Sequence, residues 1–466
     1  MHFFFQRARI HLFLALSMGL ILRLWWIHAY PLVDGDSLIY GEIAKNWFGH
    51  GIYGFTAGYS IRPTLIRLPG YPLFLAACFR LFGRENYSAI LFTQTAIDLA
   101  TCLLIAAFAA RTITLRAGIV ALYLAALCPF TANYVTTPLT ETLSLFCIAL
   151  GLYAFARYVE HPGLNRWFCA LTFSISYAAL LRPDGALLGV VFLPAMFWFA
   201  RKHLAPSRAA GLALLCAALT LLPFLAWTLR NERTFHVFQP LAPRYASDPG
   251  EYIDHGWIRW VQTWCAEFTS TWEVYWNVSG SPVDIHALPT RAFDTPEEYA
   301  RTAALFDAYN ATLAITPQMD AQFAQLARER ITRHPLRFYV VLPMMRLADM
   351  WLRPRTEMLW IELRWWQFQH HRNETIFSWS YAALNLAYLL TALWGLSRRV
   401  PYTSLMVAYI ALRCLLLLTL EYPEPRYTLE CFLMIFILAA AALTMRGDPH
   451  PVPAFTSLPL SSSLSS

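Results

Sequence analysis

Long apolar runs separated by shorter polar segments dominate the hydrophobic pattern of this chain. A transmembrane helix needs about 20 mostly apolar residues. Runs of about this length lie at residues 10–30, 88–110, 116–134, 138–158, 166–181, 184–200, 209–228, 375–396, 401–420 and 427–445. The pattern predicts an all-α polytopic membrane protein with about ten transmembrane helices.

The basic residues between these runs are expected to fall on one side of the membrane. They are Arg7, Arg9, Arg111, Arg116, Arg157, Arg166, Arg201, Lys202, Arg208, Arg398, Arg399 and Arg446. Because positive loops stay in the cytoplasm, this side is predicted to be cytoplasmic, together with both termini. The N-terminal run contains Arg23 and lacks a small-residue cleavage site, so we expect a retained helix and not a signal peptide.

Two long segments, 31–87 and 229–374, are predicted on the outer side. Within the first, residues 36–48 form an expected amphipathic helix on the membrane surface, and a helix over 73–82 follows the turn RLPGYP. The second is Trp-rich, polar and partly helical. Its piece 335–352 is expected to be interfacial, because a spanning helix would move Arg398 and Arg399 to the outside. The chain thus comprises one membrane domain over 1–445, followed by a Pro/Ser-rich cytoplasmic tail, 446–466, expected to be disordered.

Composition narrows the functional classes. The chain is 57% hydrophobic and only 14% charged, against roughly 25% charged in soluble domains. The net charge of +7 is assigned to cytoplasmic loops, and no basic run interleaved with aromatics indicates a nucleic-acid partner. The nine cysteines form no CxxC pair, and no HExxH occurs, so a divalent metal is neither signalled nor excluded. No phosphate-binding glycine motif supports a soluble nucleotide donor.

The candidate chemistry begins between Asp34 and Pro72. Two carboxylates, Asp34 and Asp36, follow the first apolar run, and Arg62 and Arg67 come later. Charged residues near a bilayer are costly and therefore indicate function. A carboxylate can take a proton from a hydroxyl, and arginine can hold a phosphate with two hydrogen bonds. Together they predict group transfer from a lipid phosphate, although the aspartates could instead cap a helix and Arg67 could contact headgroups.

Further polar residues are predicted at the outer ends of later helices. Tyr40 shares a helical face with Asp36. Glu141 begins a helix in TTPLTETLSLF, where it could also be a satisfied helix-end acid, and Arg182 precedes Asp184 in LLRPDGALLG, where the two could simply pair. The remaining candidates are Arg230 and Asn231 in WTLRN, and Arg426 and Tyr427 in EYPEPRYTLE. Their joint placement on one side indicates a shared site.

The order of these motifs resembles the GT-C superfamily of polyprenyl-phosphate-sugar-dependent glycosyltransferases. The resemblance covers about 10–445 and rests on DGDSLIYGEIAKN, RLPGYP, the TET helix start, the RPD turn, WTLRN and the final PRY. It is strongest to bacterial relatives of protein O-mannosyltransferases and of the lipid A aminoarabinose transferase, similar to glycosyltransferase family 39. It implies a GT-C fold with outer juxtamembrane helices and an inverting sugar transfer on the outer, periplasmic face of a bacterial inner membrane.

The resemblance also implies residue roles. Asp36, followed by Tyr40, matches the catalytic acidic position, with Asp34 as the alternative. Arg67 matches the lipid-phosphate ligand, with Arg62 as a weaker candidate; Arg182, Arg230 and Arg426 are implied as further phosphate or sugar contacts, with Glu141, Asn231 and Tyr427 beside the substrate. The implied partners are a polyprenyl-phosphate-linked sugar, a lipid, glycan or protein acceptor, and membrane lipids.

The chain also departs from its relatives. DSLIY and RLPGYP replace the acid–Arg–Tyr and Lys-Pro-Pro elements of the aminoarabinose branch, which leaves the sugar and acceptor open. The WWDYG signature of oligosaccharyltransferases is absent, which argues against transfer to asparagine.

A competing interpretation is a transporter or flippase of lipid-linked sugars. Such proteins show inverted repeats and binding sites at mid-membrane. The chain shows no internal repeat, and only Arg23, Asp98 and the less central Arg413 are charges within the apolar runs that could serve such a site. The transferase is therefore favoured.

Overall fold

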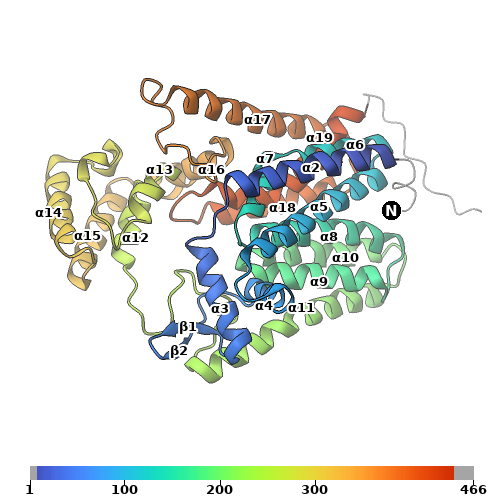
Figure 1. Cartoon of the computed structure of the whole chain (residues 1–466), viewed down its shortest axis with the longest axis horizontal. Coiled ribbons are helices and arrows are strands. Elements are labelled where there is room, and N and C mark those ends of the chain that lie inside the picture. The colour runs from blue at the N-terminus through green and yellow to red at the C-terminus, as the bar shows by residue number, and fades with distance from the viewer. Residues whose placement is uncertain (1–7, 446–466) are drawn as a thin grey trace, which may run out of the picture.

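A bundle of long helices forms most of the molecule (Figure 1). The structure, a computed structural model of the chain, describes residues 8–445. The bundle helices are α2 (Arg9–Ala29), α5 (Tyr87–Thr112), α6 (Leu115–Ala126), α8 (Glu141–Glu160), α9 (Arg166–Leu181), α10 (Leu187–Ala200), α11 (Pro206–Phe235), α17 (Arg372–Leu396), α18 (Thr403–Leu417) and α19 (Phe432–Thr444). Its centre is α8 and α19, whose side chains are almost entirely buried.

The chain is a multi-pass membrane protein, and every predicted apolar run is mostly helical. Within residues 8–445, seven helices are long and apolar enough to span a membrane, or eight if one bent pair is a single span. The predicted number of ten is therefore not reached by this criterion. The difference arises because α9 and α18 have 16 and 15 residues, whereas a straight span needs about 20.

The predicted helix 116–134 is in fact broken. α6 ends at Ala126, and a bend of 52° leads into α7 (Pro129–Ala132) and the 3₁₀ turn η1 (Asn133–Thr136). Proline lacks an amide hydrogen and pushes the preceding residue out of the helical region, and Cys128 is indeed extended. The bend turns the chain across the end of the bundle, where Thr137 lies 3.1 Å from the hydroxyl of Ser37.

The segment 31–87 lies at the end of the bundle opposite the start of α2 and the end of α19, as Figure 1 shows; we call this the outer end. α3 (Asp36–His50) confirms the predicted helix and crosses this end. An antiparallel hairpin of β1 (Gly54–Ala57) and β2 (Ser60–Pro63), which the sequence did not predict, follows. α4 (Gly70–Phe82) then leads back to the bundle.

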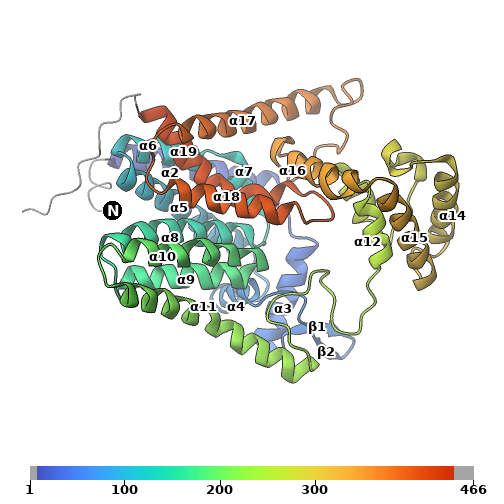
Figure 2. The same ribbon diagram turned by 180° about the vertical axis from the view of Figure 1, so that it is seen from behind.

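The segment between α11 and α17 forms a helical unit beyond the outer end, visible from behind in Figure 2. It contains α12 (His255–Gln262), α13 (Phe268–Ser270), α14 (Pro296–Thr312), α15 (Pro317–Arg333) and α16 (Leu342–Leu352). Three tryptophans, Trp257, Trp260 and Trp264, are fully buried in its own hydrophobic core, which accounts for the Trp-rich composition. α16 follows the π-helical turn η6 (Arg337–Val341) without a break, and several apolar side chains over 336–352 are exposed. The segment is not among the candidate membrane spans within residues 8–445, and its position at the membrane interface stays a prediction. The predicted tail 446–466 lies outside the described residues.

The two charges in the middle of the bundle neutralise each other. Arg23 of α2 is fully buried and donates to Asp98 of α5 at 2.6 Å. Its remaining nitrogens donate to the carbonyls of Gly19 and Ala126, both at 2.8 Å, and contact Cys102 Sγ. Since every polar group of the pair is satisfied, the geometry is that of a structural link between α2, α5 and α6.

Candidate active site at the outer end

Asp36 lies at the first residue of α3, with its carboxylate turned towards two arginines. The residue before it, Gly35, has φ +45° and makes no side-chain cap. A positive φ is easily adopted by glycine, and it allows the chain to turn sharply from 30–34 into the helix. Asp36 Oδ1 accepts from Arg67 Nη2 at 2.6 Å, and Oδ2 lies 3.7 Å from Arg426 Nη2. Asp36 therefore forms ion pairs, and the helix-cap alternative does not describe it.

Arg67 is held by two tyrosines, one that contacts its backbone and one that contacts its guanidinium. The hydroxyl of Tyr53 donates to the carbonyls of Arg67 and Leu68 at 2.9 and 3.2 Å, which fixes the turn before α4. The guanidinium lies 5.7 Å from the ring centre of Tyr40, a cation–π contact. Burial raises the pKa of Tyr40 to about 12, so its hydroxyl remains protonated at neutral pH.

Arg426 approaches from the 3₁₀ segment η7 (Pro425–Cys431). It pairs with Glu424, and its Nε lies 3.8 Å from Glu141 Oε1. Arg355, which is fully buried, donates to the carbonyl of Pro425 at 3.1 Å and to Thr428. This anchoring fixes the backbone on both sides of Arg426 and hence its direction.

Further charged side chains lie behind Asp36 and its two arginines. Arg182 lies 3.0 Å from Glu141 and 3.1 Å from Asp184, so it does pair with Asp184 as one interpretation of the sequence held, but not with Asp184 alone. Arg413 joins Asp184 at 2.9 Å to Glu430. We call the set the outer ionic network: Asp36, Arg67, Glu141, Arg182, Asp184, Arg413, Glu424, Arg426 and Glu430. With all groups ionised, its five carboxylates and four guanidiniums carry a net charge of −1.

Tyr427 lies between the two central arginines of the network. Its ring centre is 5.3 Å from the guanidinium of Arg182 and 5.7 Å from that of Arg426. Both contacts are cation–π interactions, in which the negative face of the ring attracts the cation. Contact of Tyr427 with a substrate remains a prediction.

The outer ionic network is partly accessible. The side chains of Asp36, Arg67 and Arg426 are 34%, 19% and 20% exposed, and those of Arg182 and Asp184 behind them are 15% and 16% exposed. Glu141 is 4% exposed and Arg413 is fully buried. We call Asp36, Arg67 and Arg426 the accessible edge, because it contains the most exposed carboxylate of the network, flanked by two guanidiniums. The more buried members hold this edge in place through a continuous chain of ion pairs.

Asp36 is anionic at neutral pH. Burial by itself raises the pKa of its carboxyl, but the nearby Arg67 and Arg426 outweigh this effect and leave the pKa below its ordinary value. Both arginines stabilise the charged form. In the resting state the carboxylate is thus ready to accept a hydrogen bond but is a weak base.

Four predicted residues neither belong to the outer ionic network nor contact it in the described structure. Asp34 is exposed, and Arg62 on β2 pairs with Glu251 at 2.6 Å, with both side chains well exposed. Arg230 donates to the carbonyls of Thr64 and Tyr53 at 2.7 and 2.8 Å, and Asn231 donates to that of Gln239 at 2.8 Å. These two contacts tie the hairpin and the segment after α11 to the bundle.

Sequence reasoning did not assign a site role to several members of the network. Glu424 and Glu430 flank Arg426 and Tyr427 in EYPEPRYTLE, and Arg413 was considered only as a mid-helix charge. Arg355, which anchors η7 from outside the network, lies in the predicted outer segment 229–374 and was given no role. The signal available was the alternation of acids and arginine around PRY. It could not reveal that α18 places Arg413 against Asp184, because that contact joins residues far apart in the chain.

Metal binding finds no support in the donor set. Within residues 8–445, no three His, Cys, Asp or Glu side chains are grouped so as to hold a metal ion. The accessible carboxylate, Asp36, already has two guanidinium neighbours.

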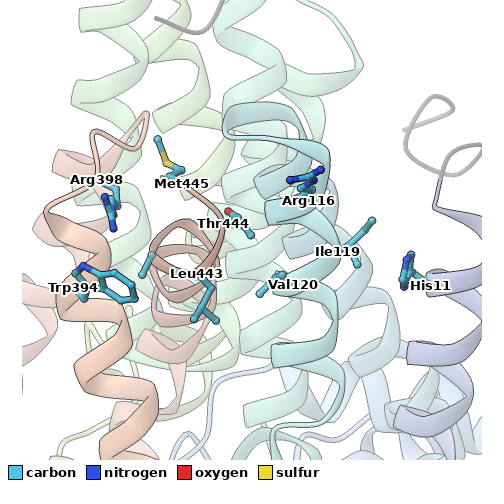
Figure 3. Close-up of a pocket in the computed structure, with 10 residues that line it drawn as sticks. His11, Arg116, Ile119, Val120, Trp394, Arg398, Leu443, Thr444 and Met445 are labelled. Carbon is cyan, nitrogen blue, oxygen red and sulfur yellow. The ribbon is translucent and has the colours of Figure 1, made fainter. Parts of the chain in front are cut away.

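Two cavities lie away from the network. One, of about 560 Å³, lies at the end of the bundle opposite α3 and is lined by α2, α6, α17 and α19 (Figure 3). The other, of about 510 Å³, lies between α12, α15 and the segment after α18, with Arg244, His255, Arg259 and Arg328 among its lining residues. The second includes Glu421, a few residues before Glu424, but neither is lined by Asp36, Arg67 or Arg426.

Comparison with known proteins identifies the fold. AglB, an oligosaccharyltransferase from Archaeoglobus fulgidus, superposes with a TM-score of 0.51 in complex with an inhibitory peptide and a dolichol-phosphate. The identity is 13%, over 94% of this chain and 50% of that chain. The chain has the GT-C glycosyltransferase fold. It spans about half the length of AglB.

Two further comparisons match this chain to a protein family and to a second solved structure. The family model of dolichyl-phosphate-mannose-protein mannosyltransferases matches residues 63–227, a region that contains Arg67, Glu141 and Arg182. A structure of ArnT from Cupriavidus metallidurans bound to undecaprenyl phosphate is 16% identical over 92% of this chain and 76% of that chain, with a TM-score of 0.39. No curated protein matches at the level of sequence.

Proposed function

We propose that the chain is a membrane glycosyltransferase that moves a sugar from a polyprenyl-phosphate donor to an acceptor hydroxyl, with inversion. The observation that carries the proposal is the accessible edge of the outer ionic network, where one carboxylate, Asp36, is flanked by the guanidiniums of Arg67 and Arg426. A general base and two phosphate ligands are the groups that such a transfer requires.

A lipid-linked donor is supported by position and by likeness. The edge lies at the end of a bundle of membrane-spanning helices, where the phosphate of a lipid anchored between them would sit. The AglB structure of the same fold contains a dolichol-phosphate, and the matched family acts with a dolichyl-phosphate sugar by its description. The donor phosphate is assigned to Arg67 and Arg426.

The proposed reaction is a single displacement at the anomeric carbon. The acceptor oxygen forms a bond to that carbon while its proton moves to the carboxylate of Asp36. The bond between the anomeric carbon and the phosphate oxygen breaks, and its electron pair leaves with polyprenyl phosphate. Arg67 and Arg426 stabilise the charge that develops on this leaving group, and their fixed positions avoid reorganisation during the reaction.

Donor binding would also activate the base. In the absence of donor, Arg67 and Arg426 hold the pKa of Asp36 below its ordinary value, and a base of low pKa is inefficient at neutral pH. A donor phosphate competes for the same guanidiniums. When they turn towards the phosphate, the pKa of Asp36 rises, so proton transfer is favoured only when a donor is present.

The proposal also includes the membrane face of the active site and the class of acceptor. The surplus of arginine at the end opposite α3 supports an active site on the periplasmic face of a bacterial inner membrane. The acceptor is a hydroxyl of a lipid, glycan or protein, since no WWDYG segment for transfer to asparagine is present. No observation favours a flippase, because Arg23 and Asp98 are buried and satisfied by each other.

Reconstitution of the full chain in liposomes tests this function. A panel of polyprenyl-phosphate sugars, labelled on the sugar, would be supplied with envelope lipids and glycans as acceptors. We expect label in an acceptor together with an equal amount of free polyprenyl phosphate, for at least one donor. Movement of intact labelled lipid between leaflets, with no free polyprenyl phosphate for any donor, would contradict the proposal and support a flippase.

A further inference from the structure

The cavity at the inner end of the bundle, opposite α3, combines cationic and apolar walls. Figure 3 shows His11 on α2, Arg116 on α6 and Arg398 just after α17 around its rim. Between them lie Ile119 and Val120 of α6 and Leu443 of α19. The cavity of about 560 Å³ thus has charges at its rim and hydrocarbon along its walls.

Within residues 8–445, the two arginines of this rim have no acidic partner, because no carboxylate lies within ion-pair distance of Arg116 or Arg398. Arg398 is positioned by the ring of Trp394, whose centre lies 5.0 Å from the guanidinium. Its Nε is buried without a hydrogen-bond partner in the described chain. An unpaired buried donor of a charged group costs free energy unless a ligand accepts from it.

Arginines with other surroundings occur at the same end. Arg111 and Arg157 both pair with Glu160, which joins the last turn of α5 to the end of α8. Arg201 lies over the ring of Trp198 at 3.5 Å, so an aromatic contact by itself does not indicate a ligand. What sets Arg116 and Arg398 apart is that both line the same cavity, a placement that suits a bound anion.

We propose that this cavity binds the headgroup of an anionic phospholipid, with its phosphate between Arg116 and Arg398 and its acyl chains along α2 and α17. The flanking helices carry exposed apolar side chains within one turn of the rim: Phe13 and Leu14 on α2, and Leu390 and Leu393 on α17. A hydrocarbon chain has a place to lie there, whereas a soluble phosphate would leave these walls uncovered. Basic pockets between helices on the cytoplasmic side are suited to acidic lipid headgroups.

The site lies at the end of the bundle away from the outer ionic network, so it is separate from the proposed transfer reaction. It could anchor α17 against α2 and α6, since its lining residues come from all three and from α19. Lipid binding there would stabilise the fold without contacting the donor. The experiment below therefore measures lipid binding and does not depend on transfer activity.

Native mass spectrometry of the delipidated full chain would test the proposal. Phosphatidylglycerol, phosphatidylcholine and glycerol phosphate would each be titrated against wild type and the double variant Arg116→Gln/Arg398→Gln. We expect phosphatidylglycerol to bind wild type more tightly than phosphatidylcholine, and the double variant to lose about thirtyfold in that affinity, from two cation contacts. The matched control Arg208→Gln/Arg399→Gln removes two exposed arginines at the same end and should change the affinity less than threefold.

Three results would overturn the proposal: equal loss in the two double variants, equal binding of both phospholipids by wild type, or binding of glycerol phosphate as tight as that of phosphatidylglycerol. The last result would assign the cavity to a soluble anion. The thermal unfolding temperature of each variant without added lipid provides the check on folding. Because all four substituted side chains lie at the surface or the cavity rim, we expect these temperatures to be similar.

Discussion

Replacing Arg426 by glutamine would remove the residue that joins the accessible edge of the outer ionic network to its buried part. The side chain lies 3.7 Å from Asp36 and 3.8 Å from Glu141, and it pairs with Glu424. Without it, the formal charge of the network changes from −1 to −2. Two carboxylates that are about 95% buried, Glu141 and Glu424, lose a cation.

The expected magnitude follows from burial. Removing one partner of a buried ion pair costs about 3–5 kcal/mol, because the remaining charge stays desolvated. Glu141 keeps Arg182 at 3.0 Å, so the lower half of this range is expected for unfolding. If Arg426 also holds the leaving phosphate, the turnover number falls by a further factor of about 10²–10³, the usual cost of one fixed donor at a developing charge.

Two variants separate stability from chemistry. Arg426→Lys keeps the charge and should recover part of the stability, but it lacks the planar fork that bonds a phosphate twice, so transfer should stay low. Arg62→Gln is the matched control, since its pair with Glu251 is well exposed and such pairs contribute at most about 1 kcal/mol. Thermal unfolding in detergent and initial rates of sugar transfer would be measured for all three. If Arg426→Gln unfolds no earlier than Arg62→Gln and transfers sugar at the same rate, the reasoning is wrong.

Further predictions concern residues around the site. Asp98→Asn should destabilise the bundle by about 3–5 kcal/mol, because Arg23 stays buried without a counter-charge. The double variant Arg23→Leu/Asp98→Leu should recover most of that loss and retain sugar transfer. If the pair served transport, both variants would instead lose activity. Burial raises the pKa of Asp349 to about 6. The folded protein therefore keeps a proton that the unfolded chain loses near pH 4. As the pH rises from 4 to 6, the free energy of unfolding should fall, and it should stay at the lower value above pH 6. Asp349→Asn should flatten this profile and raise stability at pH 8 by on the order of 3 kcal/mol, read from unfolding curves across pH. Arg230→Ala should free the hairpin, seen as faster proteolysis within 53–64 and a higher KM, with unfolding of the bundle little changed.

The sequence was sufficient for the helices because each apolar run must bury or face lipid over its whole length. The sequence also divided the loops between the two ends of the bundle, because the arginine-rich short segments, such as 111–116 and 398–399, were expected on one side. It could not show the bend after α6, because the competition between the apolar run and Pro129 is decided by packing. The predicted count of ten spans is not confirmed, because α9 and α18 are apolar but have only 16 and 15 residues.

The sequence predicted only part of the candidate site, because contacts between distant elements are decided by the fold. Asp36, Arg67, Glu141, Arg182 and Arg426 were chosen individually at helix ends, and the structure brings them together. Arg62 and Arg230 carry the same charge in similar positions along the chain, yet one pairs at the surface and the other supports the hairpin. Only the fold distinguishes these outcomes, because ion pairing depends on which distant element lies opposite.

The central claim is tested most directly by measuring the release of free polyprenyl phosphate in liposomes with the preferred donor and acceptor. The proteins compared are wild type, Asp36→Asn and Asp34→Asn. The account predicts a loss of about 10²–10⁴-fold for Asp36→Asn, the contribution of a general base, with near wild-type release by Asp34→Asn, whose side chain is exposed outside the network. Folding should be preserved in both, since Asp36 is only partly buried. Undiminished release by Asp36→Asn, or a loss confined to Asp34→Asn, would contradict the assignment of Asp36 as the base.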